Sequence, residues 1–136
     1  MRPLLAVSLG FAATLVLSTL GEIVLDAALA APDGSPLPLG RTFLSATLAV
    51  AFAASVVGGF IAAQLARSDR LRAALGVAAL SAALLALSAL DAPADAPSVI
   101  AWALPVLAFV GAASGGAIRA NVRAAPTTTA VGRDPT

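Results

Sequence analysis

Four long runs of apolar residues follow one another along the chain, each bounded by polar or proline-rich segments. They cover residues 4–30, 42–66, 71–90 and 98–118. A helix rises 1.5 Å per residue, so about 20 apolar residues cross a hydrocarbon core roughly 30 Å thick, and each run reaches that length. Backbone amides in lipid must be satisfied within the spanning segment itself. We therefore expect four membrane-spanning α-helices.

The segments between these runs have the composition of turns. Residues 32–41 contain three prolines and two glycines, which prevent the first helix from continuing. Residues 67–70 are enough to join two antiparallel helices. Residues 91–97 are again proline-rich, and Ser98 follows them as a typical helix N-cap. Residues 124–136 are rich in threonine and proline, which predicts a flexible tail.

Composition supports a membrane protein and excludes several chemistries. Hydrophobic residues make up 60% of the chain and charged residues 11%, whereas a soluble domain carries roughly a quarter charged residues. We therefore predict one integral-membrane domain over residues 1–136, an all-α bundle of four transmembrane helices. The absence of His and Cys excludes disulfides and the usual zinc, haem and iron–sulfur ligands, so no cofactor or metal is expected.

The arginines predict the orientation of the bundle. If the N-terminus is cytoplasmic, only Arg41 lies outside, and seven arginines lie inside. These are Arg2, Arg67, Arg70, Arg72, Arg119, Arg123 and Arg133. This bias follows the positive-inside rule and predicts that both termini are cytoplasmic. We expect the bundle to lie in a bacterial inner membrane, and the lysine-free, Ala- and Arg-rich composition indicates a GC-rich genome.

The first run has a second interpretation, as a secretory signal. Arg2 precedes the run, and Ala28-Leu29-Ala30 resembles a cleavage site. The run is longer than a usual signal core and carries Glu22 and Asp26 near its end, so a retained spanning helix is favoured.

Small residues recur at four-residue spacing in the second and fourth runs. Gly58, Gly59, Gly111 and Gly115 are the strongest candidates for helix packing, since glycine weakens a helix unless a close contact requires it. Ser18 and Ser55 are further packing candidates. A similar row of alanines in the third run, residues 74 to 86, is explained by composition alone.

Two acids lie near the end of the first run, on a stripe of small and polar residues at four-residue spacing. Glu22 and Asp26 are candidates for ion coupling, because acids within a membrane often mark ion pathways. Counting about 20 residues from Leu4 places Glu22 in the last turn of the hydrocarbon core. This depth favours an interfacial or helix-packing role over transport chemistry.

The arginines expected on the cytoplasmic side have two interpretations. They can hold lipid head groups or contact an acidic partner, or they can simply set the topology, which is the interpretation we favour. The candidates for such contacts are Arg67, Arg70, Arg72, Arg119 and Arg123. A net charge of +1 gives no reason to expect a nucleic-acid partner.

The first half of the chain resembles a group of small bacterial four-helix inner-membrane proteins of unknown function. In that group a first helix ending in an acid, here Glu22, precedes a proline-rich loop, here residues 32–38. The second helix closes with Gly-Gly-aromatic-x-Ala-Ala, here Gly58-Gly59-Phe60-Ile61-Ala62-Ala63. The resemblance implies a four-helix membrane fold and brings no activity with it.

The sequence therefore predicts a non-enzymatic membrane protein. No phosphate-binding loop, nucleophile elbow or pair of facing carboxylates is present. An accessory or structural subunit of a larger membrane complex ranks first, with membrane lipid and other membrane protein subunits as partners. The alternative is a small homo-oligomeric proton- or cation-coupled transporter or channel that uses Glu22.

Overall fold

The computed structural model describes residues 3–29, 41–66, 69–90 and 98–122, and these residues form four α-helices. The helices are α1 (Pro3–Leu29), α2 (Arg41–Leu65), α3 (Arg70–Leu90) and α4 (Ser98–Val122). All four are long and apolar enough to cross a membrane. The prediction of an all-α bundle of four potential spans is therefore confirmed.

Three helices have the expected bounds to within one residue, whereas α4 is longer than expected. It ends at Val122 and not at residue 118. The apolar run stops at Ile118, but a basic residue in the last turn, here Arg119, suits the negative end of the helix dipole and allows the helix to continue. The predicted flexible tail at 124–136 lies outside the described residues.

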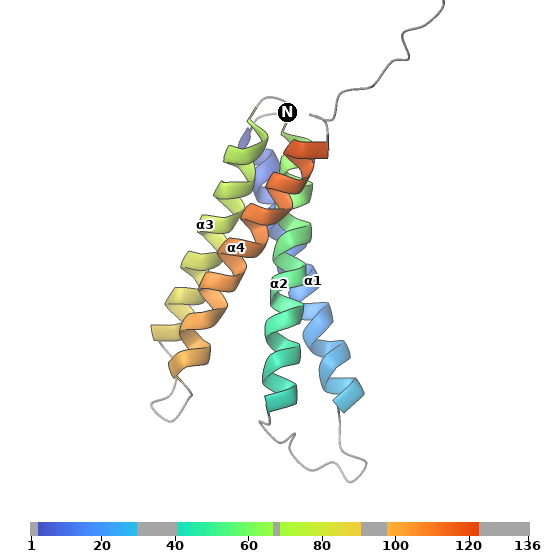
Figure 1. Cartoon of the computed structure of the whole chain (residues 1–136), viewed down its shortest axis with the longest axis vertical. Coiled ribbons are helices and arrows are strands. Elements are labelled where there is room, and N and C mark those ends of the chain that lie inside the picture. Colours follow the sequence, from blue (N-terminus) through green and yellow to red (C-terminus); the bar gives the residue numbers. More distant parts are fainter. Residues whose placement is uncertain (1–2, 30–40, 67–68, 91–97, 123–136) are drawn as a thin grey trace, which may run out of the picture.

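The helices run up and down, so that α1 begins and α4 ends at the same end of the bundle (Figure 1). Arg70, Arg72 and Arg119 mark this end, which we call the arginine end. Contacts join α1 to α2 and α3, and α2 and α3 to one another and to α4. Toward the opposite end, the pair α1–α2 diverges from the pair α3–α4 (Figure 1).

The core lies toward the arginine end and consists almost entirely of alanine. Val77, the one larger residue in it, is completely buried. The other members are Ala6, Ala62, Ala66, Ala73, Ala78 and Ala112. Such small side chains let helix backbones approach closely, which is how helices associate in lipid.

Two adjacent glycines of α2 contact two different helices. A Cβ on Gly58 would collide with the Thr14 hydroxyl of α1, and a Cβ on Gly59 would collide with the backbone carbonyl of Ala112 in α4. Successive residues of a helix are about 100° apart around its axis, so neighbouring positions face different partners. The pair therefore fixes α1 and α4 on separate sides of α2.

The glycines of α4 meet α2 in the same way. A Cβ on Gly111 would lie 2.9 Å from the Phe52 carbonyl oxygen, and one on Gly115 would collide with the Val56 carbonyl oxygen. Ser55, 2% exposed, lies against Gly111. A glycine that the sequence did not single out lies at the contact between α1 and α3. A Cβ on Gly76 of α3 would lie 3.0 Å from Val7 of α1.

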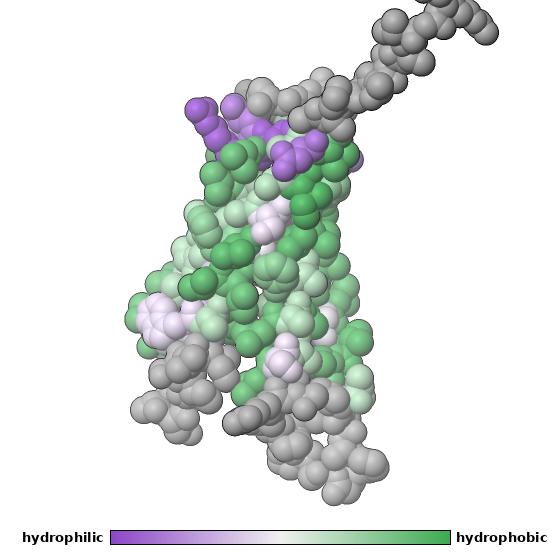
Figure 2. All heavy atoms as spheres, in the orientation of Figure 1, coloured by the Kyte–Doolittle hydropathy of each residue, from purple (hydrophilic) through white to green (hydrophobic). Residues whose placement is uncertain are grey.

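The outer surface of the bundle is apolar. At most 33% of the residues in any span are buried, and large side chains such as Leu4, Val16 and Ile23 are more than half exposed. On the face shown in Figure 2, hydrophilic residues gather at the arginine end, above a hydrophobic body. Such a surface is suited to lipid, because the contact of so much apolar area with water is unfavourable.

Pro105 lies within α4 and is buried. Proline removes one backbone hydrogen bond of a helix and clashes with the preceding turn, so a kink is predicted from the sequence. The helix continues through Pro105, from Ser98 to Val122, and the kink stays a prediction.

Candidate functional site

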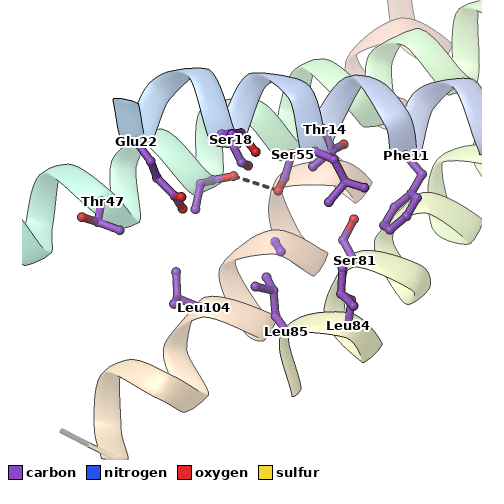
Figure 3. Close-up of a pocket in the computed structure, with 14 residues that line it drawn as sticks. Phe11, Thr14, Ser18, Glu22, Thr47, Ser55, Ser81, Leu84, Leu85 and Leu104 are labelled. Carbon is purple, nitrogen blue, oxygen red and sulfur yellow. Dashed lines mark hydrogen bonds between the residues drawn. The ribbon is translucent and has the colours of Figure 1, made fainter. Parts of the chain in front are cut away.

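A cavity of about 210 Å³ lies between the four helices, directly below the alanine core. The core uses residues 6 of α1 and 73–78 of α3, whereas the cavity wall begins at Phe11 and Ser81. The cavity therefore occupies the part of the bundle where the two helix pairs diverge (Figures 1 and 3).

Polar side chains from three helices line this cavity. Figure 3 shows Glu22 and Ser18 on α1, Thr47 and Ser55 on α2, and Ser81 on α3 around the same space. Among the described lining residues, Glu22 alone is charged. Its side chain is exposed, so a molecule that enters the cavity can reach the carboxylate.

The stripe of polar residues on α1 explains why Glu22 reaches the cavity and Asp26 does not. Residues four apart on a helix drift by about 40° per step, so the stripe winds around α1. Thr14, Ser18 and Glu22 line the cavity, whereas Asp26 is exposed and absent from its wall. The structure thus separates the two acids that the sequence offered as ion-coupling candidates.

The hydroxyl groups on α2 are already used as donors. Thr47 donates to the Phe43 carbonyl oxygen at 3.0 Å, and Ser55 donates to the Ala51 carbonyl oxygen at 2.8 Å. Such bonds to the preceding turn are common for serine and threonine in helices. Each hydroxyl oxygen still has free lone pairs, so this wall presents hydrogen-bond acceptors to the cavity.

Ser81 was not identified from the sequence as a site residue. It is 5% exposed, and its hydroxyl has no hydrogen-bond partner among the described residues. The signal that could have found it is its spacing, because Ala74, Val77 and Ala78 precede it on the buried face of α3. A buried hydroxyl without a partner is costly, so its position beside the cavity calls for an explanation.

The opposite wall of the cavity is hydrocarbon. Leu84 and Leu85 of α3 and Leu104 and Ala108 of α4 form it. The cavity therefore has two chemically distinct sides, with the carboxylate and acceptor oxygens on α1 and α2 and the aliphatic side chains on α3 and α4. Ser81 adds a single hydroxyl to the α3 side.

The packing candidates Ser18 and Ser55 differ in their surroundings. Ser55 is buried and contacts α4 as well as the cavity, whereas Ser18 is half-buried and lines the cavity. Thr14 combines both situations, since it lines the cavity, packs against Gly58 and donates to the Gly10 carbonyl oxygen at 3.1 Å.

The arginine candidates lie away from the cavity. Arg72 forms an exposed ion pair with Asp69 at 3.7 Å, and the Arg119 guanidinium lies 5.8 Å from the centre of the Phe60 ring. Neither contact includes a cavity residue. Arg67 and Arg123 fall outside the described residues.

Within the described ranges, no group of three or more potential ligand residues is arranged to hold a metal ion. The four long apolar helices place the molecule in the class of helical multi-pass membrane proteins. Comparisons with protein-family models, curated proteins and solved structures gave no match. The cavity is therefore the feature of the molecule from which a function can be inferred.

Proposed function

We propose that this chain is a small membrane transporter that binds a compact solute in the cavity and uses the Glu22 carboxylate as its coupling charge. The observation that carries the proposal is the position of Glu22 on the cavity wall, with no cationic side chain among the described residues beside it. A carboxylate within a membrane protein is costly unless a cation or a proton neutralises it. A bound cation or a proton supplies that neutralisation.

The packing of the bundle supports movement of a solute. The arginine end is closed by the alanine core, and the helix pairs diverge at the opposite end (Figure 1). An internal site that is closed at one end and approached from the other suits alternating access, in which helix pairs rock around a central site. The lining has no histidine, cysteine or lysine, so we propose binding and movement and no chemical conversion of the solute.

An accessory subunit of a larger complex is the function that the sequence alone ranks first. The exposed apolar faces are compatible with it, but lipid covers such faces equally well. A polar cavity with a carboxylate has no part in a purely structural subunit, and for that reason we place transport first.

The test of transport uses the absence of cysteine from the chain. Proteoliposomes with a trapped pH indicator measure proton movement after a membrane potential is imposed. A Ser18→Cys variant is expected to conduct until a charged, water-soluble thiol reagent modifies it, because cysteine reacts as a thiolate in water. Its flux is then expected to fall to that of protein-free vesicles.

Val16→Cys is the matched control, since Val16 lies two residues away on α1 and is 57% exposed on the outer surface. The same reagent is expected to leave its flux unchanged. Transport is rejected if the unmodified chain moves protons no faster than protein-free vesicles. In that case the accessory role takes its place, and co-purification in mild detergent identifies the partner.

We further propose that the arginine end faces the cytoplasm of a bacterium, with both termini on that side, because of the arginine distribution. Asp69 is exposed at this end, so a cysteine placed there is expected to react with an impermeant reagent only after inverted membrane vesicles are prepared. Labelling of Asp69→Cys in intact cells would show that the arginine end faces outward and would contradict this orientation.

A further inference from the structure

We propose that the cavity binds a compact protonated amine, an alkylammonium ion, with its N–H groups on the Glu22 side and its hydrocarbon against the leucine wall. This inference rests on the proposed function and names its substrate class. Three separate properties of the cavity lead to it (Figure 3).

The first property is an excess of acceptors. The hydroxyls of Thr47 and Ser55 donate their hydrogen bonds to backbone carbonyl oxygens of α2, so they offer only lone pairs to a ligand. The Glu22 carboxylate, in its charged form, also only accepts. A ligand that satisfies this wall must donate hydrogen bonds and carry positive charge, and an ammonium group with several N–H donors does both.

The second property is the hydrocarbon wall. Leu85, Leu104 and Ala108 offer no oxygen ligand to the cavity. Hard inorganic cations such as Ca²⁺ and Mg²⁺ are surrounded by oxygen ligands, and the leucine wall provides none. An alkyl chain, by contrast, gains free energy against these side chains. The wall therefore favours an organic cation.

The third property combines the size of the cavity with the free hydroxyl of Ser81. Sites for drug-sized ligands measure roughly 300–1,000 Å³, so a cavity of about 210 Å³ fits a smaller molecule. Ser81 is 5% exposed, and its hydroxyl has no partner among the described residues. A polar ligand can satisfy this hydroxyl, and a purely apolar ligand cannot.

Calorimetric titration of the detergent-purified chain at neutral pH tests the proposal with three probes. Butylammonium carries both charge and N–H donors, since alkylamines, like the lysine side chain, are protonated at this pH. Tetramethylammonium keeps the charge without donors, and butanol keeps the alkyl chain without charge. We expect saturable binding of butylammonium, binding of tetramethylammonium weaker by about tenfold or more, and no binding of butanol.

Paired variants assign the binding to the cavity. Glu22→Gln is expected to remove butylammonium binding, whereas Asp26→Asn, on the same helix but outside the cavity wall, is expected to retain it. Ser81→Ala is expected to weaken binding several-fold with an unchanged or higher melting temperature. Ser88→Ala is its control, because the Ser88 hydroxyl is exposed and donates to the Leu84 carbonyl oxygen.

The outcomes separate this inference from the proposed function. Equal binding of tetramethylammonium or butanol, or undiminished binding by Glu22→Gln, overturns the amine site. If amines fail to bind while Ser18→Cys still conducts protons in a reagent-sensitive manner, transport stands and the amine is wrong. If butylammonium binds through Glu22 but no flux is measured, the amine site stands and transport is wrong.

Discussion

Leucine at Gly115 is expected to force α2 and α4 apart and to lower the free energy of unfolding by about 3 kcal/mol, the upper part of the usual range for overpacking. Even a Cβ at this position would collide with the Val56 carbonyl oxygen and lie 2.9 Å from the Phe60 amide nitrogen. These atoms belong to the backbone of α2, which cannot turn aside as a side chain does. Separation of the helices would then open the contact between α2 and α4.

Thermal unfolding in mild detergent measures this effect, and two variants serve as controls. Ala117→Leu adds the same side chain at an exposed position of α4, two residues from Gly115. Gly76→Ala adds a Cβ that would lie 3.0 Å from a methyl group of Val7, so it meets a side chain and not the backbone. Both are expected to cost much less than Gly115→Leu. An unchanged melting temperature in Gly115→Leu would show that α2 and α4 do not pack as described.

The fold was predictable because lipid leaves little choice of structure. Alanine, valine and isoleucine leave the choice between helix and strand open in water, but a spanning segment in lipid must satisfy its own backbone. The lengths of the apolar runs then predict where the helices begin and end, and nearly all of these bounds agree with the structure to within one residue. The end of α4 differed because a hydropathy boundary marks where lipid ends, and a helix can continue beyond it through Arg119.

The cavity was less predictable because it depends on how helices face one another. The sequence identified Glu22 as a coupling candidate and Ser18 as a packing candidate, but where these side chains lie in the bundle depends on how α1 and α4 pack against Gly58 and Gly59 of α2. Periodicity within one helix does not reveal those contacts. Counting depth along α1 placed Glu22 near the edge of the hydrocarbon core and favoured an interfacial role. Depth along the membrane normal says nothing about whether a side chain points outward or into a gap between helix pairs.

Ser81 illustrates the same limit from the other direction. A serine in an alanine-rich helix is unremarkable in sequence, and its burial becomes visible only when α3 is packed against its neighbours. The tight glycine and alanine contacts at the arginine end hold the two helix pairs together there, and the space below them is left for the polar residues. Thr14 and Ser55 belong to both sets, since each lines the cavity and also packs against a glycine of a neighbouring helix.

The second large effect is expected from Glu22→Gln, which should reduce proton flux in proteoliposomes to that of protein-free vesicles while the bundle stays folded. Glutamine keeps the size of the side chain and most of its hydrogen bonds, but it has neither the negative charge nor a proton to exchange. A structural role at the helix surface needs only the polar group, so it survives this change. A coupling role needs the carboxylate and is lost.

Asp26→Asn is the matched control for this prediction. It neutralises an acid one turn further along α1, and the Asp26 side chain is exposed without lining the cavity. If general surface charge drives the flux, both variants lose it to a similar extent. If protons move through the cavity, only Glu22→Gln loses the flux. Equal melting temperatures of the two variants would exclude unfolding as the cause of that loss. Full flux in Glu22→Gln would remove Glu22 from the mechanism, because no other described lining residue carries a charge that could replace it.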